Sequence, residues 1–389
     1  MAAVKSFIDD NVVYNGMVGR VQTNLAAIRK ARGVGAAELA KKAGVTRQTI
    51  YAIEAGTYVP NTEVTLQLAR SLEVTVEELF SLPLERREEA ATVNADYLGQ
   101  HSPANGQAVR VCRIGARWVS VPVDARPYHL PEADAVVTVP SSRNQRAKLR
   151  LFSEEETMRN KIVLAGCDPA TSLLARMVER LSGVEIVHAP ASSQLGLDWL
   201  KEGKVHIAGS HLQDPATSEF NMPFIRRQFA NRDMAVVTFA RWEEGFVVSP
   251  GNPKNVHGAE GLARKNVTLM NRERGSGSRA LLDTLLQTAS LTAKDVRGYG
   301  TVAFGHLAAA HAVLAGEADC CIATRSAAQT FGLDFIPLRS EQYDFVLHRE
   351  TFRLAAVEAL FDALQRASLR RKLETLAGYD TSQTGVIRA

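Results

Sequence analysis

The 389-residue sequence predicts a chain of several domains: an all-α bundle of five helices, then a small β-rich segment, then an α/β domain. Three observations support this prediction. The chain exceeds one ordinary domain and is long enough for two or three separate cores. Apolar residues recur at helical spacing through residues 18–82. From Lys161 onward, short apolar runs alternate with helical segments, which is typical of an α/β fold.

Composition limits the class of protein. The formal net charge is only +4, so the chain is not a polycation that coats nucleic acid. The four cysteines show neither metal-ligand spacing nor a disulfide framework, which favours a reducing, cytoplasmic location. No apolar run approaches the roughly 20 residues that span a bilayer, and the start of the chain does not resemble a signal peptide. We therefore expect a cytoplasmic protein without membrane contact.

Residues 38–54 are the most informative part of the sequence. They read as two short helices joined by a turn at Gly44, a residue that tolerates the left-handed conformation that ends a helix. Thr46 is placed to cap the second helix, in which Ile50 and Ile53 share the buried face. This is the pattern of a helix-turn-helix, whose second helix reads the major groove of DNA.

Polar side chains lie outward on the first turns of that second helix. Arg47 could pair with guanine and Gln48 with adenine, although either could hold a phosphate instead. Six basic residues lie between Arg29 and Arg47 with Glu38 alone opposing them, which suits a phosphate-facing surface. The DNA-binding residues that we predict are Thr46, Arg47, Gln48, Thr49, Tyr51, Lys41 and Lys42.

Residues 18–82 resemble the XRE-type helix-turn-helix family of phage repressors (Cro/C1). The resemblance includes the segment 53–56, Pro60 before the fourth helix, and the closing segments 72–74 and 77–80. It implies a five-helix DNA-binding domain. The chain departs from the family at residues 36–37, two alanines where a polar phosphate contact is usual. A protein-interaction module is the alternative for this bundle.

The middle of the chain carries a weaker signal. Residues 83–107 read as a polar linker, and residues 108–142 as a small β-rich segment. Within that segment we expect a hairpin of 109–114 and 117–121 around Gly115, and a third strand at 135–139. Residues 143–159 are charged and read as a second linker. A spacer or a dimerisation element is the expected role.

The α/β part places small polar residues after its predicted strands. Ligands bind at the carboxyl ends of parallel strands, where helix N-termini offer free N–H groups. Loops of this kind follow the strands 162–165, 184–188 and 205–208. Asp168 and the two serines after the second strand could instead be helix caps, and most histidines in proteins are structural. The candidate ligand-binding residues in these loops and at a later helix start are Cys167, Thr171, Ser172, Ser192, Ser193, Ser210, His211 and His306.

A fourth loop, residues 271–279, gives the strongest indication of ligand binding among these loops. It follows the strand 267–270 and opens the helix 280–288. Its glycines allow close approach of a ligand, its serines add hydroxyl groups, and its arginines can neutralise an anion. A flexible turn would need no more than such glycines and serines. The candidate ligand-binding residues here are Arg274, Gly275, Ser276, Gly277, Ser278 and Arg279.

Residues 160–389 resemble the type II periplasmic-binding-protein fold, in particular the PBP-like domain of molybdate-related regulators and solute-binding proteins. The stretches 191–193, 209–214, 221–224, 247–253, 271–279 and 306–319 carry this resemblance. It implies two lobes that close on a ligand, the first formed by 160–241 with 335–389 and the second by 245–330. It also implies a small anionic effector: molybdate, tungstate or the molybdenum cofactor.

Together these features predict a transcriptional regulator that binds double-stranded operator DNA as a homodimer and senses a small anion. Two half-sites are the usual route to useful affinity, because one recognition helix covers few base pairs. We expect no catalytic residues, no catalytic cofactor and no metal site, since the sequence lacks a phosphate-loop lysine, a nucleophile elbow and a convincing pair of metal-binding histidines. A different organic solute, or an enzyme domain tethered to the DNA reader, are the alternatives.

Overall fold

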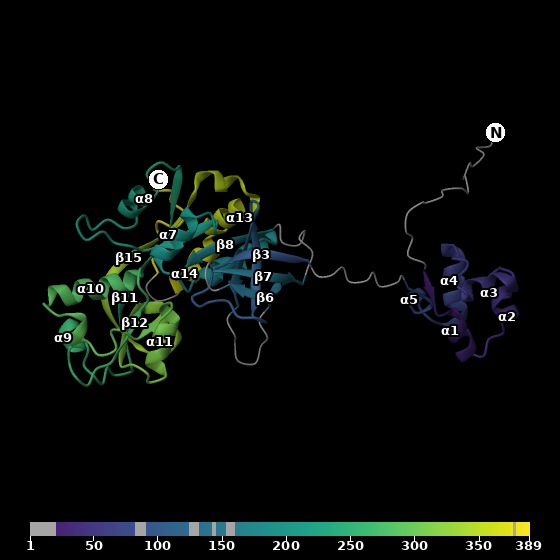
Figure 1. Ribbon diagram of the computed structural model, residues 1–389, viewed down its shortest axis with the longest axis horizontal. Helices are drawn as coiled ribbons and strands as arrows, with labels where there is room; N and C mark the ends of the chain where they lie inside the picture. Colours follow the sequence, from purple (N-terminus) through teal and green to yellow (C-terminus); the bar gives the residue numbers. More distant parts are fainter. Residues whose placement is uncertain (1–20, 82–90, 124–131, 142–144, 153–159, 376–378) are drawn as a thin grey trace. The chain divides into compact units, whose positions relative to one another are not determined.

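The computed structural model describes residues 21–81, 91–123, 132–141, 145–152, 160–375 and 379–389. The chain forms two compact units, Met1–Glu89 and Ala90–Ala389 (Figure 1).

The first unit is a helical bundle closed by a short antiparallel ribbon of β1 (Gln22–Thr23) and β2 (Phe80–Ser81). Its helices are α1 (Leu25–Ala31), α2 (Ala36–Lys42), α3 (Arg47–Glu54), α4 (Thr62–Leu72) and α5 (Val76–Leu79). One apolar core joins them, with these side chains fully buried: Leu25, Leu39, Ile50, Ile53, Leu68 and Leu79.

Local sequence explains where these helices begin and end. Gly44 has φ +67°, so the turn between α2 and α3 uses the left-handed conformation that glycine tolerates best. The Thr46 hydroxyl accepts a hydrogen bond from Thr49 N–H at 3.1 Å and caps α3. Arg29 of α1 donates to both carboxylate oxygens of Glu54 at 2.6 and 3.1 Å, which fixes the far end of α3 against the bundle.

A closed β-barrel opens the second unit, in the order β3-β5-β4-β6-β7. The hairpin of β4 and β5 and the strand β6 lie where the sequence predicts them. The strand bounds are β3 (Thr92–Tyr97), β4 (Ala108–Ile114), β5 (Arg117–Pro122), β6 (Ala135–Ser141) and β7 (Arg146–Leu151).

The structure corrects two linker assignments in this region. Residues 83–107 are not only a linker, because β3 lies within them, and the charged stretch 143–159 contains β7. In β3 the polar Asp96 is buried because Arg117 and Arg146 pair with it at 2.7 and 3.2 Å. In β7 exposed basic residues alternate with buried apolar ones, as in a strand with one face in the core. The basic residues make this segment look like a charged linker in the sequence.

The barrel packs directly on the α/β domain. Leu98, Cys112 and Val119 share a core with Val163 and Val187 of that domain. Charged side chains form ion pairs at the edge of this contact. Lys161 Nζ lies 2.7 Å from the carboxylate of Asp134, which belongs to the barrel, and 3.1 Å from that of Glu185. The barrel is therefore part of the unit that contains the candidate ligand site.

The α/β domain is built on one eight-stranded sheet with the order β13-β12-β14-β11-β15-β10-β8-β9. The two longest strands, β11 and β15, pair antiparallel along their whole length and form its centre. The bounds are β8 (Lys161–Gly166), β9 (Glu185–Pro190), β10 (Ile207–Ser210), β11 (Met234–Val248), β12 (Leu269–Arg272), β13 (Val302–Ala303), β14 (Cys320–Thr324) and β15 (Asp334–His348).

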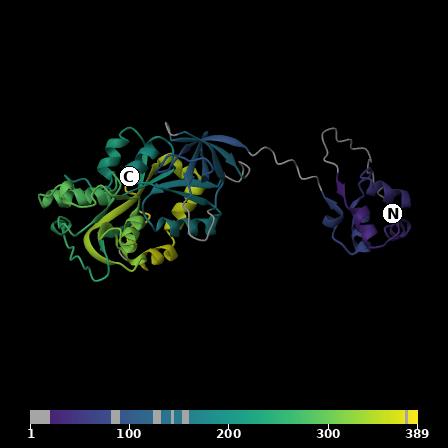
Figure 2. The same cartoon turned by 60° about the horizontal axis from the view of Figure 1, so that its bottom comes forward.

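Helices cover both faces of this sheet (Figures 1 and 2). Beside β8, β9 and β10 they are α6 (Thr171–Ser182), α7 (Ser193–Lys201), α8 (Met222–Gln228), α13 (Ala355–Leu364) and α14 (Ala367–Thr375). Beside β12, β13 and β14 they are α9 (Ala259–Leu262), α10 (Gly277–Thr288), α11 (His306–Leu314) and α12 (Arg325–Thr330). Short 3-10 turns lie at η2 (Ala293–Asp295) and η3 (Arg349–Arg353).

The sheet thus has two halves with separate cores. The first half contains β8, β9 and β10, the second contains β12, β13 and β14, and only β11 and β15 run through both. This corrects the predicted lobe boundaries, because residues 334–337 pair with 245–248, and Phe335, Ile336 and Leu338 pack in the second half. The register of β11 against β15 shifts at Thr238/Ala240 and at Glu244/Gly245, near the middle of the pair.

Candidate functional site

The first candidate site is the outer face of α3. Arg47 and Gln48 are exposed, and Tyr51 keeps 44% of its surface accessible. Arg47 donates to the Tyr51 hydroxyl at 3.0 and 2.8 Å, so these two side chains are held together on this face. Thr49 is half-buried, and Thr46 acts as the helix cap. The face carries the donors and acceptors that base edges require, and its contacts with DNA stay predictions.

Two further predicted DNA-binding residues lie at the end of α2. Lys41 and Lys42 are both exposed, and Lys42 pairs with Glu38 at 2.8 Å. An ion pair between exposed side chains one helical turn apart contributes little to the stability of the helix. Both ammonium groups therefore remain accessible to a phosphate.

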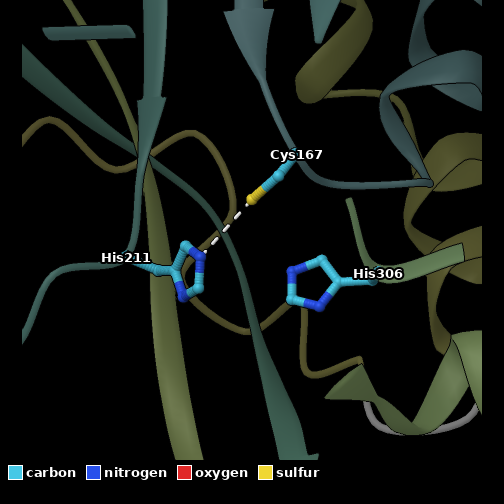
Figure 3. Close-up of side chains that lie close together, drawn as sticks. All are labelled: Cys167, His211 and His306. Carbon is cyan, nitrogen blue, oxygen red and sulfur yellow. Dashed lines mark hydrogen bonds between the residues drawn. The ribbon is translucent and has the colours of Figure 1, made fainter. Parts of the chain in front are cut away.

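The second candidate site lies where the two halves of the sheet meet. Cys167 follows β8, His211 follows β10, and His306 begins α11 of the other half. Figure 3 shows the Cys167 sulfur and the two imidazole rings pointing toward one another. Cys167 Sγ lies 3.4 Å from His211 Nε2, and the two ring centroids are 5.7 Å apart. We call these three residues, together with Glu244 and Glu341 beside them, the central cluster.

His211 is held from every side. Its Nδ1 bonds the carboxylate of Glu341, and its backbone N–H donates to Ser193 Oγ at 3.1 Å. Arg339 donates to the other oxygen of Glu341 at 2.7 Å. The ring also packs at 5.4 Å from the Trp242 ring, and both side chains are almost fully buried. The orientation of the His211 ring is therefore fixed by strands β10, β11 and β15.

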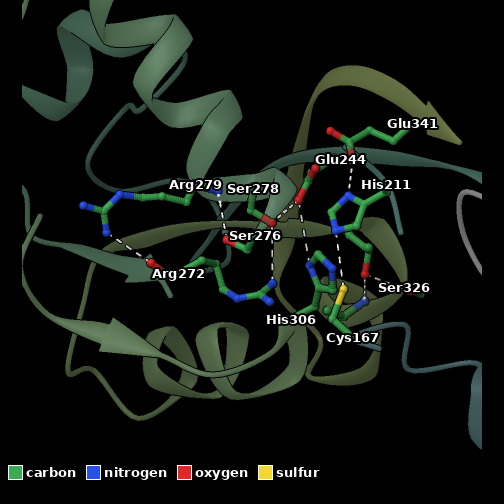
Figure 4. A network of polar contacts seen from close by, with 12 residues as sticks. Cys167, His211, Glu244, Arg272, Ser276, Ser278, Arg279, His306, Ser326 and Glu341 are labelled. Atoms are coloured by element: carbon green, nitrogen blue, oxygen red, sulfur yellow. Dashed lines mark hydrogen bonds and ion pairs between the residues drawn. The ribbon is translucent and has the colours of Figure 1, made fainter. Parts of the chain in front are cut away.

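A chain of polar contacts connects Glu244 to the second half (Figure 4). The Ser278 hydroxyl donates to Glu244, and Arg272 Nη1 lies 3.5 Å from the same hydroxyl. Arg272 is fully buried and donates twice to Glu273, at 2.8 Å each. The guanidinium and its partner carboxylate thus bring little net charge to the cluster.

Burial sets the protonation of the central cluster. It raises the pKa of Glu244 to about 8, with nearby Glu341 acting in the same direction, so Glu244 is mostly neutral at pH 7. Burial, aided by Arg272 and His211, lowers the pKa of His306 well below its usual value, so that ring is neutral. Burial lowers the pKa of His211, but neighbouring Cys167 and Glu244 outweigh it and leave that pKa raised.

Several buried polar atoms of this region have no hydrogen-bond partner among the described residues. They include both ring nitrogens of His306, Trp242 Nε1 and Ser210 Oγ. His306 Nδ1 lies 3.8 Å from Glu244 Oε1, which is too long for a hydrogen bond. Buried polar groups are normally paired, so these atoms are candidates for contact with a ligand.

A cavity of about 670 Å³ reaches the central cluster at Cys167 and His306. The starts of α6 and α11 both line it, and neither helix has a side-chain cap at its N-cap residue, Ala170 or Gly305. The barrel contributes part of the wall. The lining includes Gln100, Arg110, Val121, Glu132, Cys167, Asp168, Thr171, Ser172, Pro190, Ala191, Glu273, Phe304, His306 and Leu307.

The predicted ligand-binding residues divide into two groups. Cys167, His211, Ser278 and His306 meet in or beside the central cluster, and Ser193 and Ser210 are buried next to it. Gly275 and Gly277 press against the first half: Gly275 O accepts from Gln194 N–H at 3.2 Å, and a Cβ on Gly277 would lie 2.5 Å from the His211 ring. The loop 275–278 therefore joins the two halves.

The other group does not point at the central cluster. Arg274 is exposed, and Arg279 turns away to stack 4.1 Å from the Tyr299 ring centroid. Ser192 caps α7, which is the alternative that the sequence left open for it, and Ser276 caps α10. Thr171 and Ser172 line the cavity, but their hydroxyls donate to backbone carbonyls of the same turn, at 2.7 and 2.9 Å.

Sequence reasoning missed the centre of the site. Glu244 and Glu341 come from the two long strands. Arg272 is the buried last residue of β12, whereas the sequence predicts Arg274 and Arg279 as the ligand-binding arginines. Buried charged residues within an apolar strand are a usable signal, since lone charges are rarely buried without a partner. Their meeting point still depends on the pairing of β11 with β15, which no local pattern reveals.

Comparison with known families agrees with this architecture. Residues 25–79 match a family described as helix-turn-helix, and residues 174–365 match the PBP superfamily domain. The chain thus combines a DNA-binding motif of transcription regulators with a periplasmic-binding-protein-like domain. It belongs to the PBP superfamily over its α/β domain and to the helix-turn-helix family over its first unit.

Individual relatives match different lengths of the chain. The "Uncharacterized protein YvgK" of Bacillus subtilis (strain 168) is 32% identical over 243 residues, which cover 62% of this chain and 78% of the relative. An "Uncharacterized HTH-type transcriptional regulator" of Archaeoglobus fulgidus is 37% identical over 60 residues, 15% of this chain and 86% of the relative. A putative phosphate ABC transporter substrate-binding protein with bound phosphate from Clostridium perfringens aligns at 13% identity and TM-score 0.44, covering 57% of this chain and 99% of that chain.

No helix in the described ranges is long and apolar enough to cross a membrane.

Proposed function

We propose that the protein is a cytoplasmic, ligand-responsive transcriptional regulator that binds operator DNA as a homodimer and senses a small anion. The exposed face of α3 supports the DNA part, because Arg47 and Gln48 present hydrogen-bonding groups to solvent there. A dimer would place two such helices one helical turn apart on the duplex.

The starts of α6 and α11 at one cavity carry the proposal of an anionic effector. The partial positive charge of both helix N-termini faces the cavity, and the first turn of α11 has no side-chain cap. At the start of α6 the Thr171 and Leu173 N–H groups donate to Asp168 O and Ala170 O at 3.3 and 3.0 Å, so that helix contributes mainly its dipole. Two of the carboxylates that line the cavity carry a reduced net charge, whereas Glu132 also lines it. Burial raises the pKa of Asp168 to about 7, and Arg272 pairs with Glu273.

The volume of the cavity bears on the size of the anion. At about 670 Å³ it lies in the range of pockets for organic ligands and exceeds what a bare tetrahedral oxyanion fills. Among the effectors that the family resemblance implies, this favours the molybdenum cofactor over molybdate or tungstate.

Closure of the two halves would couple effector binding to DNA affinity. The halves are joined by β11 and β15 and by the 275–278 loop, so a ligand that contacts both would favour their approach. Such a ligand must bind one arrangement more tightly than the other to change DNA affinity.

DNA binding is tested by selecting sequences from a random duplex pool and measuring gel retardation. We expect salt-sensitive, sequence-selective binding by the full chain and its loss in Arg47→Ala/Gln48→Ala. Binding that is insensitive to both substitutions would exclude α3 as the reader.

The effector is tested by calorimetry with molybdate and tungstate, and by the fluorescence of oxidised pterin released from protein purified from molybdenum-replete cells. We expect either heat on titration with molybdate or tungstate, or the fluorescence of released pterin. If neither signal is seen, this class of anion is excluded and another organic solute becomes the expected effector.

A further inference from the structure

The central cluster has the composition of a transition-metal site. Cys167 offers a thiolate, and His211 and His306 each offer an imidazole nitrogen; the three ligand atoms all lie within 4.8 Å of one another. Zinc bonds of about 2.0 to 2.3 Å place two ligands of one ion roughly 3.5 Å apart. The Cys167 Sγ to His211 Nε2 distance of 3.4 Å already has that value.

The surroundings of His211 match those of a metal-binding histidine. Metal ligands of this type usually donate their second ring N–H to a carboxylate, which fixes the tautomer and the orientation of the ring. Glu341 bonds His211 Nδ1, so Nε2 is the nitrogen that faces Cys167. Arg339 in turn holds Glu341 at 2.7 Å.

His306 supplies the independent observation. Its ring is 1% exposed, yet neither nitrogen has a hydrogen-bond partner among the described residues. A buried imidazole without partners is costly, and bonding to an ion would remove that cost. The ring lies at the cavity wall with Cys167, so an ion has a path to the cluster.

We propose that Cys167, His211 and His306 bind one borderline or soft transition-metal ion, of which Zn²⁺ is the reference. A thiolate with two imidazoles is a donor set that such ions prefer over hard cations like Mg²⁺. The fourth position faces the cavity, where a water or an oxygen of the effector completes the tetrahedron. The Cys167 thiolate balances part of the positive charge of the ion, and Arg272 adds little repulsion because it is paired with Glu273.

The ion would also connect the two halves of the sheet. Cys167 and His211 belong to the first half, and His306 belongs to the second. This inference uses the cavity of the proposed function but requires neither DNA nor an anion.

Cobalt titration of the full chain, stripped of metal with a chelator, tests the site. We expect one equivalent of Co²⁺ to give a thiolate-to-cobalt charge-transfer band and the strong visible bands of tetrahedral cobalt, both lost on adding Zn²⁺. Cys167→Ser should abolish the charge-transfer band. Cys320→Ser is the matched control, because Cys320 is buried in β14 with Thr268 O as an acceptor at 3.9 Å.

Two further measurements keep the test decisive if a variant misfolds. Glu341→Gln should weaken Zn²⁺ binding about 10- to 100-fold, the usual effect of losing such a supporting carboxylate. X-ray absorption of the zinc-loaded wild type should show one sulfur and two imidazoles. No stoichiometric binding, or a zinc shell without sulfur, would overturn the proposal. DNA and molybdate binding by the metal-free protein are measured separately, so the metal site and the proposed function can fail independently.

Discussion

Substituting Gly277 with alanine tests whether contact between the two halves governs ligand binding. A Cβ at this position would lie 2.5 Å from Cε1 and Nδ1 of the His211 ring and 2.9 Å from its carbonyl oxygen. The ring cannot swing aside, because Glu341 and Cys167 hold its two nitrogens. The loop 275–278 must therefore retreat from the first half.

The size of the effect follows from the cost of overpacking. An added methyl in a tight contact costs about 1 to 3 kcal/mol. If the effector binds the closed arrangement, its affinity should fall roughly 5- to 150-fold, since 1.4 kcal/mol is a factor of ten. Calorimetry with the effector found for the wild type measures this. Gly300→Ala is the control, because a Cβ there meets nothing within 4 Å. Equal affinities in the two variants would refute closure at this contact.

Three further predictions concern stability, each measured by urea unfolding. Arg29→Ala should destabilise the first unit by about 2 kcal/mol, because Glu54 loses its paired hydrogen bonds to a guanidinium that is 11% exposed; an unchanged midpoint would show that the pair does not hold α3. Burial lowers the pKa of His206 to about 4, and its Nδ1 accepts from Val163 N–H. Because only the unfolded chain takes up that proton between pH 6.5 and pH 4, wild-type stability should fall by about 3 kcal/mol as the pH drops through this window, and His206→Gln should remove that loss; parallel pH profiles would contradict it. Asp134→Asn should cost about 3 kcal/mol by leaving Lys161, 8% exposed, short of a partner, whereas a loss below 0.5 kcal/mol would mean that the ion group does not hold the barrel.

The helix-turn-helix could be predicted in detail because its signals are local. Gly44, the Thr46 cap and the spacing of Ile50 and Ile53 each act within one or two turns, and the structure has all of them. The strands and helices after Lys161 were predictable for the same reason: hydrophobic period and turn residues decide them over short stretches.

The barrel and the central cluster depend on distant contacts. Asp96 makes β3 look polar until Arg117 and Arg146 arrive from other strands to pair with it. Likewise, Glu244 and Glu341 are nearly 100 residues apart and meet only through β11 and β15. The sequence does not separate Arg272 from Arg274, because it does not show that β12 extends to Arg272 and buries it, whereas Arg274 lies in the exposed turn that follows.

The central claim is that a ligand between the two halves changes how tightly the first unit binds DNA. Its most direct test is the affinity of the full chain for its selected operator, measured at one fixed salt concentration with and without saturating effector. We predict a change of 5- to 150-fold in either direction, about 1 to 3 kcal/mol of coupling, and the same factor in effector affinity when operator is added. Identical operator affinities under both conditions would contradict the account.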